Sequence, residues 1–193
     1  NIKGGVGKTT TAMGLATAAA RRGLASSVVD IDPSASSSAW AAEADGDGNP
    51  LPFSVTPGNT VTLKSLAPKE DEWVFIDCPP GGGTAVAAGG AAVAAADFVV
   101  VPSQATSADV REAFQLKEVL EMSGKPYAIV ITRAVPAEIG HRETMAILEE
   151  SDASYFETVI PQRAGIKRAW GCNFGADLYG YDALFEELEG AVG

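Results

Sequence analysis

Short, continuously apolar segments alternate with helix-like segments along almost the whole chain, and this alternation limits the fold more than any other feature. The apolar segments are SSVVDID, WVFIDCPP, DFVVVPS and YAIVITRA, and helical patterns such as ADVREAFQLKEVLEMSG lie between them. Strands that are buried on both faces have this composition. The pattern predicts an α/β fold in which a doubly wound, mostly parallel sheet carries helices on both faces.

The length and composition favour one soluble domain. A chain of 193 residues can bury a substantial core, and no repeat or linker divides it, so we expect a single domain over residues 1–193. No segment is long and apolar enough to span a bilayer. The two cysteines, Cys78 and Cys172, form no disulfide framework and lack metal-ligand spacing, which is typical of a reducing cytoplasm.

The formal net charge of −11 excludes a general attraction to nucleic acid or to anionic lipid. Any DNA binding therefore needs a local basic patch. The stretch QRAGIKRAW supplies one candidate, formed by Arg163, Lys167 and Arg168. The alternative is that these are ordinary solvated side chains.

The stretch NIKGGVGKTT precedes a predicted helix and has the character of a phosphate-binding loop. Glycines let the backbone curl around phosphate oxygens, and the helix N-terminus adds its dipole. Lys8 would reach the phosphates, and the Thr9 hydroxyl would hold Mg²⁺. The residues expected to contact the nucleotide here are Gly4, Gly5, Val6, Gly7, Lys8, Thr9 and Thr10.

Two features of this loop depart from the usual pattern G-x-x-x-x-G-K-[ST]. Ile2 stands where a glycine is usual, and Lys3 is a lysine that the pattern does not require. No strand precedes the loop, although a strand is needed to aim it. We expect that a short N-terminal strand is missing from the sequence; the alternative is a truncated protein that holds nucleotide poorly.

Carboxylates end two of the apolar segments. Asp30 and Asp32 end one, and Asp77 ends another. Ligands of parallel sheets bind beyond the carboxyl ends of the strands, so these side chains are expected beside the glycine-rich loop. Asp77 is then placed to support Mg²⁺ together with Thr9.

These motifs together resemble the ParA/MinD family of P-loop ATPases. KGGVGKTT is similar to the deviant Walker A motif of that family, VVDIDP to its second motif and VFIDCPP to its Walker B motif. The match continues in AADFVVVPSQATSADV, ITR and VIPQR and covers nearly the whole chain. The resemblance implies a P-loop fold, ATP and Mg²⁺ as cofactors, and hydrolysis of ATP.

The resemblance also implies roles for individual residues. Lys3 matches the signature lysine, which contacts phosphate across an ATP-sandwich homodimer, and Asp32 matches the residue that orients the attacking water. Lys3, Lys8 and Asp32 are thus the expected catalytic residues. Arg133 and Pro161 are expected to line the base. CPPGGGT is similar to the second switch, where Gly81 to Gly83 would allow movement; the alternative is a loop that does not switch.

Within the family, the chain is most similar to the small ParA type, exemplified by ParF. The tail YDALFEELEGAV is amphipathic but acidic, so no membrane binding is expected from it. The resemblance implies plasmid or chromosome partition by a cytoplasmic, nucleoid-associated protein. Its ATP-bound dimer would bind nonspecific DNA, and a ParB-like or cargo-adaptor partner would stimulate hydrolysis. Positioning of carboxysomes or chemotaxis clusters, a MinD-like membrane regulator and a metabolic ligase are the alternatives.

Overall fold

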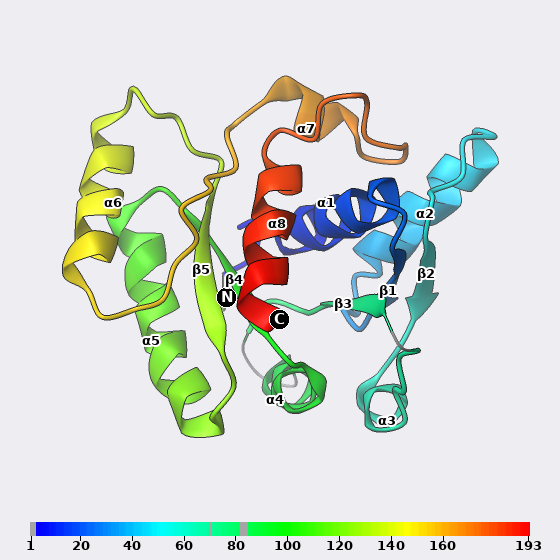
Figure 1. Ribbon diagram of the computed structural model, residues 1–193, viewed down its shortest axis with the longest axis horizontal. Coiled ribbons are helices and arrows are strands. Elements are labelled where there is room, and N and C mark those ends of the chain that lie inside the picture. Colours follow the sequence, from blue (N-terminus) through cyan, green and yellow to red (C-terminus); the bar gives the residue numbers. More distant parts are fainter. Residues whose placement is uncertain (1–2, 70, 82–84) are drawn as a thin grey trace.

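A computed structural model describes residues 3–69, 71–81 and 85–193 of the chain (Figure 1). The strands are β1 (Ala25–Asp30), β2 (Ser54–Pro57), β3 (Glu72–Asp77), β4 (Val99–Gln104) and β5 (Tyr127–Thr132). The helices are α1 (Lys8–Arg21), α2 (Ser36–Gly46), α3 (Thr60–Lys64), α4 (Ala85–Ala95), α5 (Ser107–Ser123), α6 (Ile139–Glu150), α7 (Ala164–Arg168) and α8 (Tyr181–Val192).

The strands form two parallel sheets. A three-stranded sheet has the order β2-β1-β3, and a two-stranded sheet pairs β4 with β5. Asp30 lies opposite Asp77 in the first sheet, and Gln104 lies opposite Thr132 in the second. Both registers align the carboxyl ends of neighbouring strands. The predicted strand ahead of residue 1 lies outside the described residues.

Helices cover both faces of the strand layer, as predicted. Successive residues of a strand point to opposite faces. Val28 and Val130 belong to a core that they share with α1 and α8, whereas Val29 packs with α3 and α4 on the opposite face. Ile129 packs with α5 and α6 in a third cluster. The first of these cores draws on both sheets, and α1 packs against β3 and β4 (Figure 1). The two sheets are therefore joined through shared packing.

Two segments differ from the sequence-based expectation. β2 lies within the stretch DGDGNPLPFSVTPGN, whose turn-rich composition favours irregular structure; it is a short, largely exposed edge strand that ends at Pro57. The stretch YFETVIPQR has a composition typical of a strand, but it makes only isolated bridges, at Tyr155 and at Pro161. Between them the backbone N–H groups of Glu157 and Thr158 donate to the carboxylate of Glu187 on α8 instead of to a strand.

None of the helices in the described ranges combines the length and the hydropathy needed to cross a membrane.

Candidate nucleotide site

The glycine-rich loop leads directly into α1. Gly7 is the N-cap of α1, has a φ of 93° and offers no side-chain cap to the helix. The N–H groups of the first helical turn have no partners within the helix, and they carry the positive end of the helix dipole. A Cβ added at Gly4 or Gly5 would meet no atom within 4 Å. The loop therefore leaves open space beside an uncapped helix N-terminus, which suits an anion.

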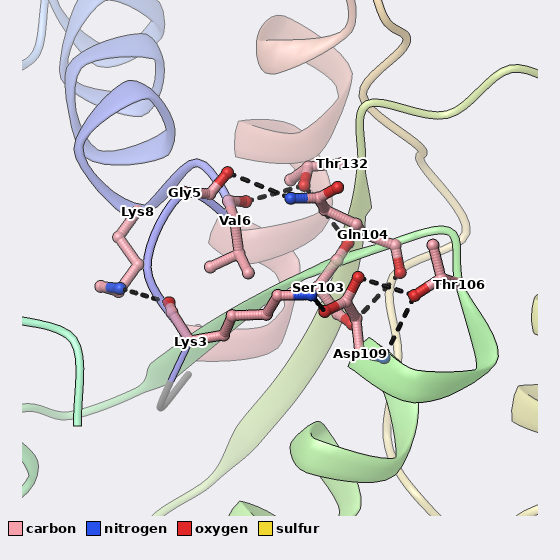
Figure 2. A network of polar contacts seen from close by, with 9 residues as sticks. All are labelled: Lys3, Gly5, Val6, Lys8, Ser103, Gln104, Thr106, Asp109 and Thr132. Carbon is pink, nitrogen blue, oxygen red and sulfur yellow. Dashed lines mark hydrogen bonds and ion pairs between the residues drawn. The ribbon is translucent and has the colours of Figure 1, made fainter. Parts of the chain in front are cut away.

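Side chains from outside the loop hold its carbonyl groups (Figure 2). Thr132, at the end of β5, donates to the Val6 carbonyl at 2.8 Å, and Gln104, at the end of β4, donates to the Gly5 carbonyl at 3.2 Å. Lys8 Nζ donates to the Lys3 carbonyl at 3.0 Å. The second sheet thus fixes the shape of the loop. No sequence motif indicates this role for Gln104 or Thr132.

Asp77 lies at the end of β3 and is 1% exposed. Its Oδ2 accepts a hydrogen bond of 2.5 Å from the Ser37 hydroxyl, whereas its Oδ1 has no hydrogen-bond partner among the described residues. Burial raises the pKa of Asp77 to about 6, although the Ser37 hydrogen bond and the nearby Thr9 hydroxyl oppose the rise. A buried carboxylate oxygen without a partner fits a metal cation, and the neighbouring Thr9 hydroxyl is an oxygen donor of the kind that Mg²⁺ prefers.

Lys8 lies in the same electrostatic environment. Burial lowers the pKa of its ammonium, and the negative charges of Asp77 and Asp32 act in the opposite direction. The structure therefore brings Lys8, Thr9, Asp32 and Asp77 together, as the sequence analysis predicted from three separate motifs.

The two carboxylates that end the first apolar segment have different surroundings. Asp30 Oδ2 accepts from the N–H and the hydroxyl of Ser38, both at 2.8 Å, so Asp30 holds the start of α2. Asp32 is only partly buried, and its Oδ1 accepts from the Ser34 N–H at 2.8 Å. Asp32 also lines a cavity of about 310 Å³ at the ends of β1 and β2. Asp30 lines the same cavity but is only 3% exposed, so Asp32 is the more accessible of the two carboxylates to a ligand.

A second cavity, of about 120 Å³, lies beside the loop between β5, α7 and α8. Gly7 and Thr10 line it together with Arg133 and Pro161, the two residues expected to contact the base. Trp170 forms part of its wall and packs against the buried Trp40, with 5.2 Å between the ring centroids. An aromatic wall at this site could not be predicted from the sequence, because the two tryptophans are far apart in the chain and no motif connects them.

The three basic residues considered for DNA binding lie at α7 and are all exposed. Arg163 and Lys167 line the cavity next to the loop, whereas Arg168 does not. The patch is therefore continuous with the candidate nucleotide site. Of the expected switch segment, Gly82 and Gly83 lie outside the described residues.

Lys3 contacts α5 of its own chain. Its Nζ donates to Asp109 Oδ1 at 2.5 Å (Figure 2). Nothing in the sequence analysis predicted this ion pair, because the two residues are distant in the chain and belong to different motifs.

The family model of the CobQ/CobB/MinD/ParA nucleotide binding domain matches residues 1–171. The chain belongs to this family. The resemblance to the ParA/MinD group of nucleotide-binding ATPases is thereby confirmed, and so is the α/β fold of parallel strands flanked by helices.

Individual relatives agree with this assignment. The chain is 32% identical over 172 residues to the maintenance of carboxysome distribution protein A of Gloeobacter kilaueensis, covering 88% of this chain and 77% of the relative. A plasmid partition protein of Borrelia burgdorferi bound to AMPPNP has a TM-score of 0.78 at 20% identity, covering 99% and 96% of the two chains. MinD of Pyrococcus horikoshii, complexed with Mg-ADP, has a TM-score of 0.77 at 18% identity, covering 99% and 94%. Nucleotide and magnesium are thus ligands found in this family.

Proposed function

We propose that the chain is a ParA-type ATPase that partitions plasmid or chromosomal DNA through an ATP-dependent dimer. The observation that carries the proposal is the buried Oδ1 of Asp77 at the end of β3, which no described residue hydrogen-bonds and which lies close to Thr9 and Lys8 at the N-terminus of α1. These residues fit a magnesium nucleotide. Lys3 at the start of the loop supports the ParA assignment within the family.

Each predicted site residue has a role in this proposal. The backbone of Gly4, Gly5, Val6 and Gly7 and the first turn at Lys8, Thr9 and Thr10 would bind the phosphates. Thr9 and Asp77 would hold Mg²⁺. When bound, the magnesium nucleotide supplies the phosphoryl group that is transferred to water, a reaction that depends mainly on positioning and on charge.

Each charged side chain would then have a separate role in hydrolysis. Asp32 orients the attacking water through its carboxylate, and Lys8 offsets negative charge on the phosphates of its own subunit. Lys3 of a second copy adds a cation in trans, so the site is complete only in a homodimer. Arg133 and Pro161 line the space for the adenine base, and the ring of Trp170 offers a flat apolar surface for that base.

We further propose that the dimer is cytoplasmic and nucleoid-associated, binds DNA without sequence preference and hydrolyses ATP when a ParB-like or cargo-adaptor partner stimulates it. The 32% identity to a carboxysome distribution protein favours cargo positioning as the second candidate function. A MinD-like membrane role gains no support from α8, because its apolar residues Leu184, Phe185 and Leu188 are buried in the core.

The test is retention of the protein on nonspecific DNA with ATP·Mg²⁺ or with ADP, over a salt series, for the wild type and Lys3→Ala. We expect retention only with ATP, loss of retention in Lys3→Ala, and weakening by salt as counterions are released. Equal retention with ADP would contradict the dimer cycle. Absence of retention in every state would contradict the DNA-binding part, and anionic vesicles and small acid substrates would then be tested.

The same assay distinguishes which basic residues at α7 contact DNA and which contact the nucleotide. Arg168→Ala should weaken DNA retention at unchanged nucleotide affinity and reduce the slope of log K against log salt by about 2 for a dimer, about 1 for each subunit. Arg163→Ala and Lys167→Ala should weaken nucleotide binding as well, because both side chains line the cavity beside the loop. Identical behaviour of all three variants would place Arg168 in the nucleotide site too, or exclude all three from DNA.

A further inference from the structure

Lys3 is docked on a carboxylate that its own chain keeps out of water. The side chain of Asp109 is 2% exposed and that of Lys3 is 46% exposed, and their charged groups meet at 2.5 Å. The hydrogen bond to Asp109, followed by its charge, raises the pKa of Lys3. The lysine head is therefore held at the first turn of α5, while part of its side chain faces solvent.

Asp109 has further partners that do not depend on Lys3. Thr106 is the N-cap of α5; its hydroxyl donates to Asp109 Oδ2 at 2.7 Å and accepts from the Asp109 N–H at 3.2 Å. The carboxylate also lies at the positive end of the helix dipole. The charge of Asp109 thus stays stabilised when Lys3 leaves, which makes the contact between them reversible.

The docked position conflicts with the function proposed for Lys3. Each N–H that the Lys3 ammonium group donates to Asp109 of its own subunit is unavailable to a phosphate in a second subunit, and the ion pair keeps the group at α5. From this conflict we propose that Asp109 is a latch, which withholds Lys3 from a partner copy until the dimer forms. The inference rests on the proposed trans role of Lys3.

The loop connects the latch to the nucleotide site of the same chain. Lys8 Nζ donates to the backbone carbonyl of Lys3 at 3.0 Å (Figure 2). Lys3 is therefore held at two points, at its carbonyl by Lys8 and at its side chain by Asp109. When Lys8 turns to a phosphate, it gives up the Lys3 carbonyl. Nucleotide binding in one subunit therefore loosens residue 3 before the side chain of Lys3 exchanges Asp109 for phosphate in the other subunit.

The first test measures the docking directly, as the rate at which an amine-acylating reagent modifies Lys3 in the nucleotide-free protein, read by mass spectrometry. Because only the neutral amine reacts, we expect Lys3 to react about tenfold faster in Asp109→Asn, the factor that separates a charge-assisted from a neutral hydrogen bond. Asp152→Asn is the matched control: it makes the same charge change and removes one of the two acidic partners of Lys117, the other being Glu121. It should speed modification of Lys117 and leave Lys3 unchanged. Equal rates for Lys3 in the wild type and in Asp109→Asn would overturn the latch.

The second test measures assembly by light scattering over a range of protein concentrations with ATP·Mg²⁺. Asp109→Asn should dimerise at protein concentrations about a hundredfold lower than the wild type, a factor of about ten for each of the two subunits, and Asp152→Asn should match the wild type. Thermal unfolding checks that the variants are folded. If Asp109→Asn does not fold, Asp109→Ser provides a second variant without the carboxylate.

The outcomes separate the latch from the function on which it rests. If Asp109→Asn assembles like the wild type while Lys3→Ala does not assemble, the latch is wrong and the trans role stands. If Asp109→Asn is as defective as Lys3→Ala, Asp109 aligns Lys3 for its partner, which also overturns the latch. If Lys3→Ala assembles normally, the trans role fails and the latch fails with it.

Discussion

At the scale of one residue, the buried carboxylate of Asp77 lowers the stability of the fold when it is ionised. Burial raises its pKa to about 6, so the folded chain holds the Asp77 proton more tightly than the unfolded chain does. This raised pKa favours folding fully below pH 4, and the benefit is lost as the pH rises through about 6. At neutral pH the ionised carboxylate therefore destabilises the nucleotide-free fold.

Asp77→Asn should stabilise the nucleotide-free protein at pH 7. A shift of about 2 pKa units sets an upper limit of roughly 3 kcal/mol on the gain in the free energy of unfolding. The gain should shrink towards zero near pH 4, where the wild-type carboxyl group is protonated. Chemical denaturation across this pH range measures it, with the exposed Asp97→Asn as a control of equal charge change. A gain that is absent at pH 7, or that grows towards low pH, would contradict the account.

At the scale of elements, the contact between α1 and α8 depends on one glycine. A Cβ added at Gly14 would lie 2.5 Å from Cγ of Tyr181, whose ring is 1% exposed. Such a distance is too short for a carbon contact, and the buried ring has little room to move. The two helices can approach this closely only because position 14 has no side chain.

Gly14→Ala should destabilise the fold by about 1–3 kcal/mol, the usual effect of overpacking a core. Gly90→Ala is the matched control, because Gly90 lies within α4 and a Cβ there meets nothing within 4 Å. The control should be stabilising by roughly 0.5–1 kcal/mol, since alanine favours a helix over glycine. Urea unfolding of both variants measures the difference, and equal effects would show that Tyr181 moves aside.

Elements with a strong local pattern could be predicted, and elements that depend on distant partners could not. The apolar runs that became β1, β3, β4 and β5 are continuous and stop at polar residues, so the sequence indicates them directly. β2 is exposed and short, and it exists because β1 offers it an edge. Glu187 of α8 accepts hydrogen bonds from two backbone N–H groups in the segment before Pro161, and no local sequence pattern predicts that interaction.

The same distinction applies to the candidate site. Motifs indicate Lys8, Thr9, Asp32 and Asp77, because each residue type follows from phosphate and magnesium chemistry at a strand end or a loop. Ser37, Gln104 and Asp109 act through contacts with residues 40 to 106 positions away in the chain. Those contacts exist only once the strands and helices have packed together.

At the scale of the whole molecule, the candidate site joins two sheets that are not paired with each other in the described part of the chain. Asp77 comes from the first sheet, and Thr132 comes from the end of the second. The loop bonds to the second sheet through Gln104 and Thr132. A ligand held by both sides would therefore stabilise both sheets together.

ATP·Mg²⁺ should slow hydrogen exchange both in residues 31–38, after β1, and in residues 160–163, before α7. At a ligand concentration of about 100 times Kd, the stabilisation is about 2.7 kcal/mol, or roughly a hundredfold slower exchange for amides that exchange by unfolding of the ligand site. Mass spectrometry of exchanged peptides measures it. Chelation of magnesium, or Lys8→Ala, should abolish the effect, and protection of the first segment alone would show that the ligand does not connect the sheets.

The pairing of α1 with α8 also sets an order of events during synthesis. Tyr181, Phe185 and Leu188 fill the core around α1, which lies at the opposite end of the sequence. A ribosome releases the chain from its N-terminus, so the surface of α1 that packs on α8 stays uncovered until α8 has emerged, although β1, β3 and β4 can cover other parts of α1 earlier. Contacts of such long sequence separation also slow folding. Until α8 arrives, the nascent protein therefore exposes apolar surface on α1, and this surface makes it vulnerable to aggregation.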